Sequence, residues 1–368
     1  MVSASAEKDL IIDADAHVVE SARTWDFMDP SERQYRPVPL QAPEENGTKL
    51  QFWLIDGKMR GLRFPAFSAA ELEKRSKQVG RKFAASQESR ELGNVDLRLQ
   101  HMDETGVDVQ VLHNTMFIES VTDHAAVEVA VYKSWNRWLA DIWRQGKGRL
   151  RWSCMAPTLS MTDALDQIRF GKENGACAVL MRPVEGNRLL SDPYFYPIYD
   201  EASRLDMPIA IHIANGNPWL TDLYTHPVRT GTGLHRFRIP TVAAFNDIVL
   251  SEIPQVFPKL RWGFIEASAQ WLPWVLHEAK NRFKTLGREW LNNFTKEYRM
   301  FVTCENSDDL PYIVQQAGAD CLVIGTDYGH TDTSSDVDAI KIFKSRTDLP
   351  PEAKRKILSD NARALYGL

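Results

Sequence analysis

Eight short apolar runs alternate with longer segments of helical periodicity along most of this chain. The runs are rich in β-branched residues and bounded by Gly, Pro or Asn, as buried strands are. Strands that alternate with helices pair in parallel through right-handed crossovers, and eight such units fit a closed ring better than an open sheet. The pattern therefore predicts an α/β fold, a (β/α)8 TIM barrel. The predicted strands are residues 10–13, 107–113, 150–155, 176–181, 208–213, 260–265, 300–303 and 321–325.

One long segment interrupts the alternation. Residues 21–95 lie between the first strand and its helix, and excursions of this length are usually lids, docking arms or disordered segments. Trp25, Phe52 and Trp53 favour an ordered lid or interface arm. We expect a single domain over residues 1–368 that carries this insertion. The predicted helices are residues 125–145, 163–174, 194–205, 273–286 and 351–366.

Composition narrows the class of protein. Hydrophobic residues make up 43% and charged residues 25% of 368 residues, which is typical of a soluble globular chain. A net charge of −5 without long runs of one sign disfavours nucleic acid and anionic membranes as partners. No apolar stretch reaches eighteen residues and the N-terminus lacks the form of a signal peptide, so we expect a cytoplasmic protein. Four widely spaced cysteines without C-x-x-C are expected to be free thiols. Eleven tryptophans suit cavity walls or a subunit interface, so we expect a homo-oligomer, with a hetero-oligomer as the alternative.

Metal-friendly residues stand at the ends of several predicted strands. Asp15 and His17 flank one residue at the end of the first strand, and residues two apart in extended chain point to the same side. His212 ends the fifth strand, and Asp327 follows the eighth. Singly, each has an ordinary explanation, such as a hydrogen-bonded core histidine or a paired buried carboxylate. Because the C-terminal ends of barrel strands meet at one rim, the four together predict a shared metal site.

Several motifs carry a family resemblance over nearly the whole chain. They are residues 12–20 (IDADAHVVE), 102–111, His212, 257–261, 325–328 (GTDY) and 361–368. The chain resembles the amidohydrolase superfamily, in particular the amidohydrolase-related family typified by aminocarboxymuconate semialdehyde decarboxylase. The resemblance implies that Asp15, His17, His212 and Asp327 surround a divalent metal. Two departures stand out: Asp15 replaces the first histidine of the usual H-x-H, and Glu266 replaces the usual strand-six histidine.

These departures change the expected metal chemistry. Glu266 could bind the metal directly or act as a general base, and three carboxylates with two imidazoles suit Mn or Fe, with Zn still open. A dinuclear site with bridging carboxylates is an alternative. Asp327 is our first choice as proton shuttle and Glu266 the second. His330, Asp332 and His113 could add ligands or proton carriers, or could equally have surface or hydrogen-bonding roles.

Three residues are candidates for contact with the substrate. Arg182 ends the fourth strand and could bind a substrate carboxylate bidentately, or form a structural salt bridge instead. His113, at the end of the second strand, and Trp271, after the sixth, are the others. His235 lies in an irregular loop that could also reach the site.

The sequence thus predicts a metal-dependent hydrolase or non-oxidative decarboxylase of a small carboxylated or carbonyl-containing molecule. One alternative is a dinuclear oxygenase or hydroxylase, with Fe or a Mn/Fe pair, built on the same fold. Another is a supporting subunit of a hetero-oligomer, without catalysis. Metal analysis separates the three, because they predict one metal, two metals including Fe, and no metal per chain.

Overall fold

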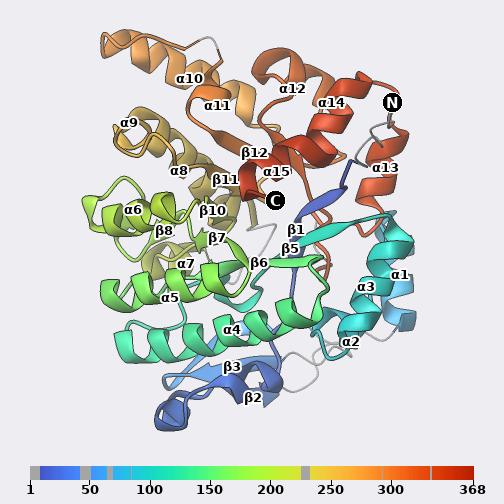
Figure 1. Ribbon diagram of the computed structural model, residues 1–368, viewed down its shortest axis with the longest axis vertical. Helices are drawn as coiled ribbons and strands as arrows, with labels where there is room; N and C mark the ends of the chain where they lie inside the picture. The colour runs from blue at the N-terminus through green and yellow to red at the C-terminus, as the bar shows by residue number, and fades with distance from the viewer. Residues whose placement is uncertain are drawn as a thin grey trace, which may run out of the picture.

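Eight parallel strands form one sheet that curls into a barrel, with helices packed around it (Figure 1). The computed structural model describes residues 9–41, 51–63, 69–83, 85–224, 233–291, 293–331 and 334–368. The predicted (β/α)8 TIM barrel is confirmed, because each expected strand occupies its expected segment. In spatial order the strands are β1 (Ile12–His17), β5 (Val109–His113), β6 (Leu150–Met155), β7 (Ala176–Met181), β10 (Ile209–His212), β11 (Trp262–Ile265), β12 (Met300–Cys304) and β13 (Leu322–Ile324).

Local sequence signals set the helix boundaries. The side chain of Asn94 caps the start of α3 by accepting a hydrogen bond from the backbone N–H of Leu97. Gly106 ends the same helix in the left-handed conformation, at φ 73°. The helices of the outer layer are α3 (Val95–Thr105), α4 (Ala125–Gln145), α5 (Met161–Glu173), α6 (Tyr196–Arg204), α8 (Ile239–Leu250), α10 (Leu272–Thr285), α12 (Leu310–Ala317), α13 (Ala339–Ser345), α14 (Pro351–Arg355) and α15 (Asn361–Tyr366).

Short elements occupy the connections between strands and helices. One of them, a π-helical turn over Lys356–Asp360, joins α14 to α15. The others are η3 (Met116–Ile118), the β8 (Val184–Glu185) and β9 (Arg188–Leu189) hairpin, η4 (Pro193–Phe195), α7 (Pro218–Tyr224), η5 (Leu234–Arg238), α9 (Ile253–Val256) and α11 (Phe294–Glu297). None of the described helices has the length and apolar character needed to cross a bilayer. All four cysteines are buried free thiols, as expected.

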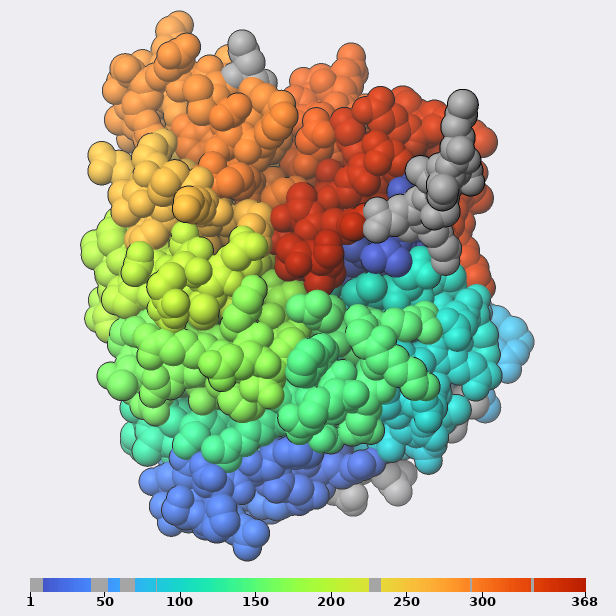
Figure 2. All heavy atoms as spheres, viewed as in Figure 1, coloured from blue at the N-terminus to red at the C-terminus, as the bar shows by residue number. Residues whose placement is uncertain are grey.

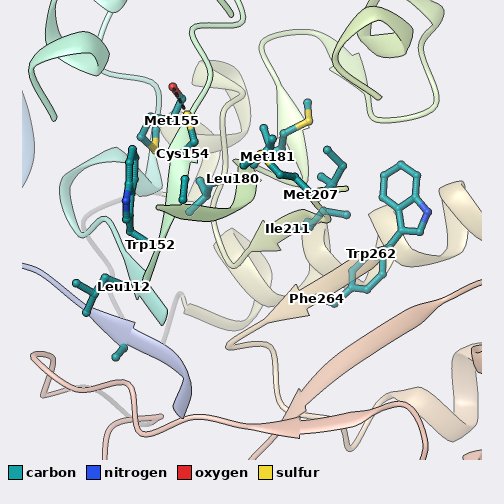
Figure 3. Packing of buried hydrophobic residues seen from close by; sticks show 14 of the residues in the cluster. Leu112, Trp152, Cys154, Met155, Leu180, Met181, Met207, Ile211, Trp262 and Phe264 are labelled. Carbon is teal, nitrogen blue, oxygen red and sulfur yellow. Dashed lines mark hydrogen bonds between the residues drawn. The ribbon is translucent and has the colours of Figure 1, made fainter. Parts of the chain in front are cut away.

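The strands separate two apolar layers. Trp152, Trp262 and Phe264 belong to the outer layer between strands and helices, which Figure 3 shows from close by. The smaller inner cluster combines strand residues such as Val111 with Leu365 and Tyr366 of α15. Arg261, just before β11, donates to the carbonyl of Leu365, so α15 covers the N-terminal end of the barrel. The opposite, C-terminal end is therefore the one left for a functional site.

The first and last strands of the barrel, β1 and β13, are joined by fewer backbone hydrogen bonds than the other neighbouring strands. Among the described residues, β1 and β13 share no continuous ladder, and an isolated bridge links Ala16 to Tyr328. The carbonyl of Asp15 accepts hydrogen bonds from the backbone N–H of Thr326 at 3.2 Å and of Asp327 at 2.9 Å. We call this junction the seam. Its contacts lie at the C-terminal ends of the two strands.

The insertion after β1 is ordered over its described residues. The rings of Trp25 and Trp53 are buried with centroids 5.7 Å apart, and Ser134 of α4 donates to the carbonyl of Thr24. The first part of the insertion, residues 22–41 and 51–63, therefore lies along α4 and forms the lower edge of the molecule in Figure 2, whereas residues 69–83 and 85–90 lie beside α3. Its elements are η1 (Ala22–Phe27), η2 (Pro30–Tyr35), the antiparallel strands β2 (Val38–Gln41), β3 (Gln51–Ile55) and β4 (Lys58–Arg63), α1 (Ala69–Val79) and α2 (Gln87–Arg90).

Candidate metal centre

Five buried polar side chains converge at the C-terminal rim of the barrel. The Nε2 atoms of His17 and His212 are 3.1 Å apart. His17 Nε2 is also 3.4 Å from a carboxylate oxygen of each of three acidic residues. Each of the five side chains belongs to a residue at most 5% exposed, so water does not screen them from one another. The structure thus brings together the five residues that the sequence nominated as ligands, which are Asp15, His17, His212, Glu266 and Asp327.

Hydrogen bonds on the far side of each imidazole determine which nitrogen faces the cluster. His17 Nδ1 lies 2.8 Å from the carbonyl of Asn114, and His212 Nδ1 lies 3.2 Å from that of Ile213. A carbonyl only accepts, so both Nδ1 atoms carry hydrogen and both Nε2 atoms present a lone pair in the neutral ring. Facing lone pairs and carboxylates repel unless a cation lies among them. Ligand atoms about 2.1 Å from one shared cation are roughly 3.0–3.4 Å apart, so the donor set fits a divalent metal.

The electrostatics of the cluster favour positive charge. Burial alone lowers the pKa of His17, but the carboxylates of Asp15 and Glu266 outweigh burial and raise that pKa to about 10. Burial would raise the pKa of Asp15, yet its interactions with His17 and His212 hold that pKa well below its usual range. A metal ion would take the place of the proton that these groups otherwise attract.

Two of the carboxylates stand on strained backbone. Glu266 and Asp327 have positive φ values of 64° and 48°, and Ser268 follows at 60°. Such conformations cost non-glycine residues of order 1 kcal/mol or more and persist where neighbours hold them. The hydroxyl of Thr303 accepts from the backbone N–H of Glu266 at 2.7 Å, and the Asp15 carbonyl accepts from that of Asp327. In this backbone conformation the carboxylates of both residues face the cluster.

Residues without a sequence motif complete the surroundings. The Ser334 hydroxyl donates to Glu266 at 2.9 Å, and that of Ser335 donates to Asp327 at 2.5 Å. These serines, and Asn114 behind His17, were missed by the sequence analysis. Their role depends on loop conformation, and single polar residues in loops carry no recognisable spacing.

His330 lies beside the cluster, as considered from the sequence. Its ring stacks on that of His17 with centroids 3.9 Å apart, and its Nδ1 is 2.7 Å from Asp327. Its Nε2 is 2.8 Å from the Thr115 hydroxyl. His17, Glu266, Asp327 and His330 therefore form a second group with metal-ligand spacing, which shares His17 and Glu266 with the group of Asp15, His17, His212 and Glu266. Asp332 lies outside the described residues.

His113 is enclosed inside the barrel and does not line the site cavity. Its Nδ1 is 2.9 Å from the Ser153 hydroxyl, and its Nε2 is 3.3 Å from the carbonyl of Ala14. Burial, with His212 nearby, lowers the pKa of His113 to about 3, so its ring is neutral. The structure therefore shows the hydrogen-bonding role that was one alternative for His113, and its contact with a substrate stays a prediction.

Arg182 is engaged in a buried ion pair. Its Nε and one terminal nitrogen donate to Glu185 at 3.0 and 2.5 Å, and its other terminal nitrogen donates to Tyr132 at 2.9 Å. The β8–β9 hairpin folds Glu185 back over the end of β7, where it occupies the guanidinium. The structure thus shows the salt bridge that was given as the alternative for Arg182, and contact of Arg182 with a substrate carboxylate stays a prediction.

Trp271 and His235 lie away from the cluster. The Trp271 ring packs against Phe245 of α8 with centroids 5.1 Å apart, and its Nε1 donates to the carbonyl of Ala267. Trp271 precedes α10 and packs in the helical layer, and its contact with a substrate stays a prediction. His235 is on η5, where its ring lies 5.1 Å from that of Tyr224.

A small cavity adjoins the two metal-facing histidines. Its volume is about 10 Å³, which is roughly the space of one water molecule. The cavity is lined by His17, Asn114, Thr115, Phe117, Ile118, Leu180, His212, Ala214 and His330.

Comparison with known proteins agrees with the fold. The family model described as Amidohydrolase matches residues 12–368. The chain belongs to the amidohydrolase family. A search of the curated proteins found no significant match.

Solved structures of amidohydrolases share the architecture. An amidohydrolase from Mycobacterium avium subsp. paratuberculosis is 16% identical with a TM-score of 0.74, over 99% of each chain. A 5-carboxyvanillate decarboxylase from Novosphingobium aromaticivorans, solved with manganese and 4-hydroxy-3-methoxy-5-nitrobenzoic acid, is 16% identical with a TM-score of 0.67, over 98% of this chain and 97% of that one. A 4-oxalomesaconate hydratase from Rhodopseudomonas palustris is 16% identical with a TM-score of 0.63, over 97% and 96%. At these identities the likeness concerns the fold.

Proposed function

We propose that this amidohydrolase is a metal-dependent hydrolase or non-oxidative decarboxylase of a small molecule that carries a carboxylate or carbonyl group. The observation that carries the proposal is a buried cluster of two overlapping groups of donor atoms that share His17 and Glu266, with the imidazoles of His17 and His212 turned to present Nε2. Three carboxylates and two imidazoles suit Mn²⁺ or Fe²⁺, and Zn²⁺ remains an alternative. The manganese in the decarboxylase of similar fold supports the same choice.

The site's own side chains supply the proton transfer that either reaction needs. A divalent cation held here would polarise a substrate oxygen and make a neighbouring water more acidic. Asp327 and His330 lie 2.7 Å apart, so a proton can pass from one to the other at the edge of the cavity. In hydrolysis the pair would take a proton from water, and in decarboxylation it would deliver one to the carbon that loses CO₂. Glu266 is the second candidate for this role.

Metal analysis of purified variants tests the ligand assignment. His212→Ala and Asp327→Ala are each expected to lose most bound metal, measured by plasma mass spectrometry, while the far-UV circular dichroism stays that of the folded barrel. His277→Ala is the matched control, because His277 is exposed on α10 and should leave the metal content unchanged. Unchanged metal in both cluster variants would show that the assignment is wrong.

Product analysis then separates the two reactions. A panel of small aromatic carboxylates is assayed for CO₂ release, and a panel of esters, lactones and amides for release of acid. Activity in one panel that disappears on chelation and returns with added Mn²⁺ identifies the reaction class.

A dinuclear oxygenase is the second candidate function. The observation that favours it is the pair of overlapping ligand groups, which share His17 and Glu266 and could hold two metals with a bridging carboxylate. Two metals per chain including Fe, with O₂ uptake in the presence of reductant, would support it. One metal and no O₂ uptake would support the first proposal. A protein that binds no metal would support the supporting-subunit alternative.

A further inference from the structure

A further buried carboxylate, that of Asp13, lies close to the cluster without belonging to it. Asp13 is in β1 and is fully buried. One carboxylate oxygen accepts from the backbone N–H of Thr326 at 2.9 Å. The other accepts from the Thr326 hydroxyl at 2.6 Å and from Nε2 of Gln110 at 2.9 Å. The backbone N–H of Asp15 also donates to the first oxygen, at 3.3 Å. Because burying a carboxylate is costly, these hydrogen bonds from Thr326, Gln110 and Asp15 stabilise the charge of Asp13.

Arg98 determines which groups donate and which accept in the hydrogen bonds around Asp13. Arg98 is a buried residue of α3, and its Nε donates to Oε1 of Gln110 at 2.6 Å. A guanidinium can only donate, so Gln110 must turn its oxygen to Arg98 and its NH₂ group to Asp13. Thr326 also offers a backbone N–H, which can only donate. Position 13 therefore has to accept on both of its oxygens, which a carboxylate does and an amide cannot.

The network crosses the seam of the barrel. Thr326 directly precedes Asp327, and β1 and β13 share no continuous ladder in the described part of the chain. The strands also approach closely, since a Cβ placed on Gly325 would lie 2.2 Å from the Cβ of Asp15. Arg98 extends the same network to β1 by donating to the carbonyl of His17 at 3.2 Å. The hydrogen bonds of Asp13 thus tie together the strand ends that carry three of the five cluster residues.

We infer that Asp13 is a positioning residue for the metal centre: it holds Thr326 across the seam and thereby sets the separation of Asp15, His17 and Asp327. The inference rests on the metal site proposed above. It differs from a purely structural role because it predicts an effect on metal affinity in a protein that remains folded. Residues of this kind behind metal ligands typically change affinity by about 10- to 100-fold when substituted.

The test is a titration of the metal-depleted full-length chain with Mn²⁺. Free Mn²⁺ is measured at each step by electron paramagnetic resonance. Asp13→Asn should weaken binding by about 10- to 100-fold at a temperature well below its unfolding midpoint. Either orientation of the new amide sets its NH₂ group against a donor, the Thr326 N–H or the Gln110 NH₂. Asp309→Asn is the matched control, since Asp309 is exposed and its side chain caps α12 by accepting from the backbone N–H of Tyr312. It should leave Mn²⁺ affinity unchanged.

A compensating double variant examines the direction of the network. In Asp13→Asn combined with Gln110→Glu, the introduced carboxylate accepts from both Arg98 and the new amide. The amide oxygen then faces the Thr326 N–H, and the net charge is that of the wild type. Binding should return to within a few fold of the wild-type value. Gln110→Glu alone places two carboxylates against each other and should weaken binding.

The outcomes are distinguishable. If Asp13→Asn binds Mn²⁺ as tightly as the wild type but unfolds more easily, Asp13 is merely structural and the inference is overturned. A double variant that stays as weak as the single variant overturns it too. Should Asp13→Asn fail to fold, Thr326→Val replaces it, with an expected loss of a few fold that Thr326→Ser restores. A wild-type chain that binds no Mn²⁺ overturns the metal site itself, and the inference with it.

Discussion

Metal binding should release a proton from His17. In the metal-free protein, burial disfavours a charged His17, but the carboxylates of Asp15 and Glu266 raise its pKa to about 10. Its Nδ1 donates to the carbonyl of Asn114, so the additional proton resides on Nε2, the atom that faces the cluster. A metal that binds Nε2 must therefore displace this proton.

The size of the effect follows from the raised pKa. Below about pH 10 a proton competes with the metal for His17, so the apparent affinity rises with pH and levels off near that value. The slope is about tenfold, or about 1.4 kcal/mol, per pH unit. Between about pH 7 and about pH 8.5 the dissociation constant for Mn²⁺ should therefore fall by roughly 30-fold.

Isothermal titration calorimetry measures both quantities. Repeating the Mn²⁺ titration in buffers of different ionisation enthalpy gives the number of protons released, which should be close to one per metal. His277→Ala, with its exposed imidazole, should show the same proton release as the wild type. A dissociation constant that does not change with pH, together with no proton release, would refute the place of His17 in the ligand set.

Three further predictions follow from the packing around the site. Arg182→Met should lower the free energy of unfolding, measured in urea, by about 3–5 kcal/mol, because Glu185 is left buried without its ion-pair partner. Adding Glu185→Met should restore part of the loss. Unchanged stability together with weaker substrate binding would contradict a structural role for the Arg182–Glu185 pair. The pKa of His113 is lower in the folded chain than in the unfolded one, so acidification protonates the unfolded state first. The contribution of His113 to the free energy of unfolding of the metal-free protein should then fall by about 2 kcal/mol between about pH 7.5 and about pH 5. His113→Gln lacks this contribution, so the difference in free energy of unfolding between the wild type and this variant should change by that amount, measured by urea unfolding at both pH values. Gly325→Ala should cost about 1–3 kcal/mol and weaken Mn²⁺ binding, because its Cβ would overlap Asp15; unaltered binding would show that the seam tolerates separation.

The strands were predictable because of how the barrel buries them. Parallel strands covered on both faces read as continuous apolar runs, and the runs at residues 150–155 and 176–181 coincide with β6 and β7. The helix at residues 125–145 coincides with α4 for a similar reason, since its apolar positions follow helical spacing. Local sequence carries this information because burial and periodicity are properties of neighbouring residues.

The cluster was predictable in membership but not in geometry. Asp15, His17, His212 and Asp327 stand at strand ends, and parallel topology alone brings such ends together. The tautomers of the two histidines depend on carbonyls at Asn114 and Ile213, whose positions follow only from the folded loops.

The sequence by itself determined the barrel, its free cysteines and the residues gathered at one rim. Only the tertiary structure decided which polar side chains at the strand ends form hydrogen bonds or ion pairs outside the cluster. Arg182 stands at a strand end like the cluster residues, yet a hairpin returns Glu185 to it, and Trp271 turns into the helical layer instead of the cavity. In the sequence Asp13 has no feature that separates it from the rest of its strand. Only the fold places Gln110 and Thr326 where they donate hydrogen bonds to it. Strand ends follow from local pattern, whereas the partner of a polar side chain depends on residues distant in sequence, because hydrogen bonds and ion pairs require contact that only the completed fold provides.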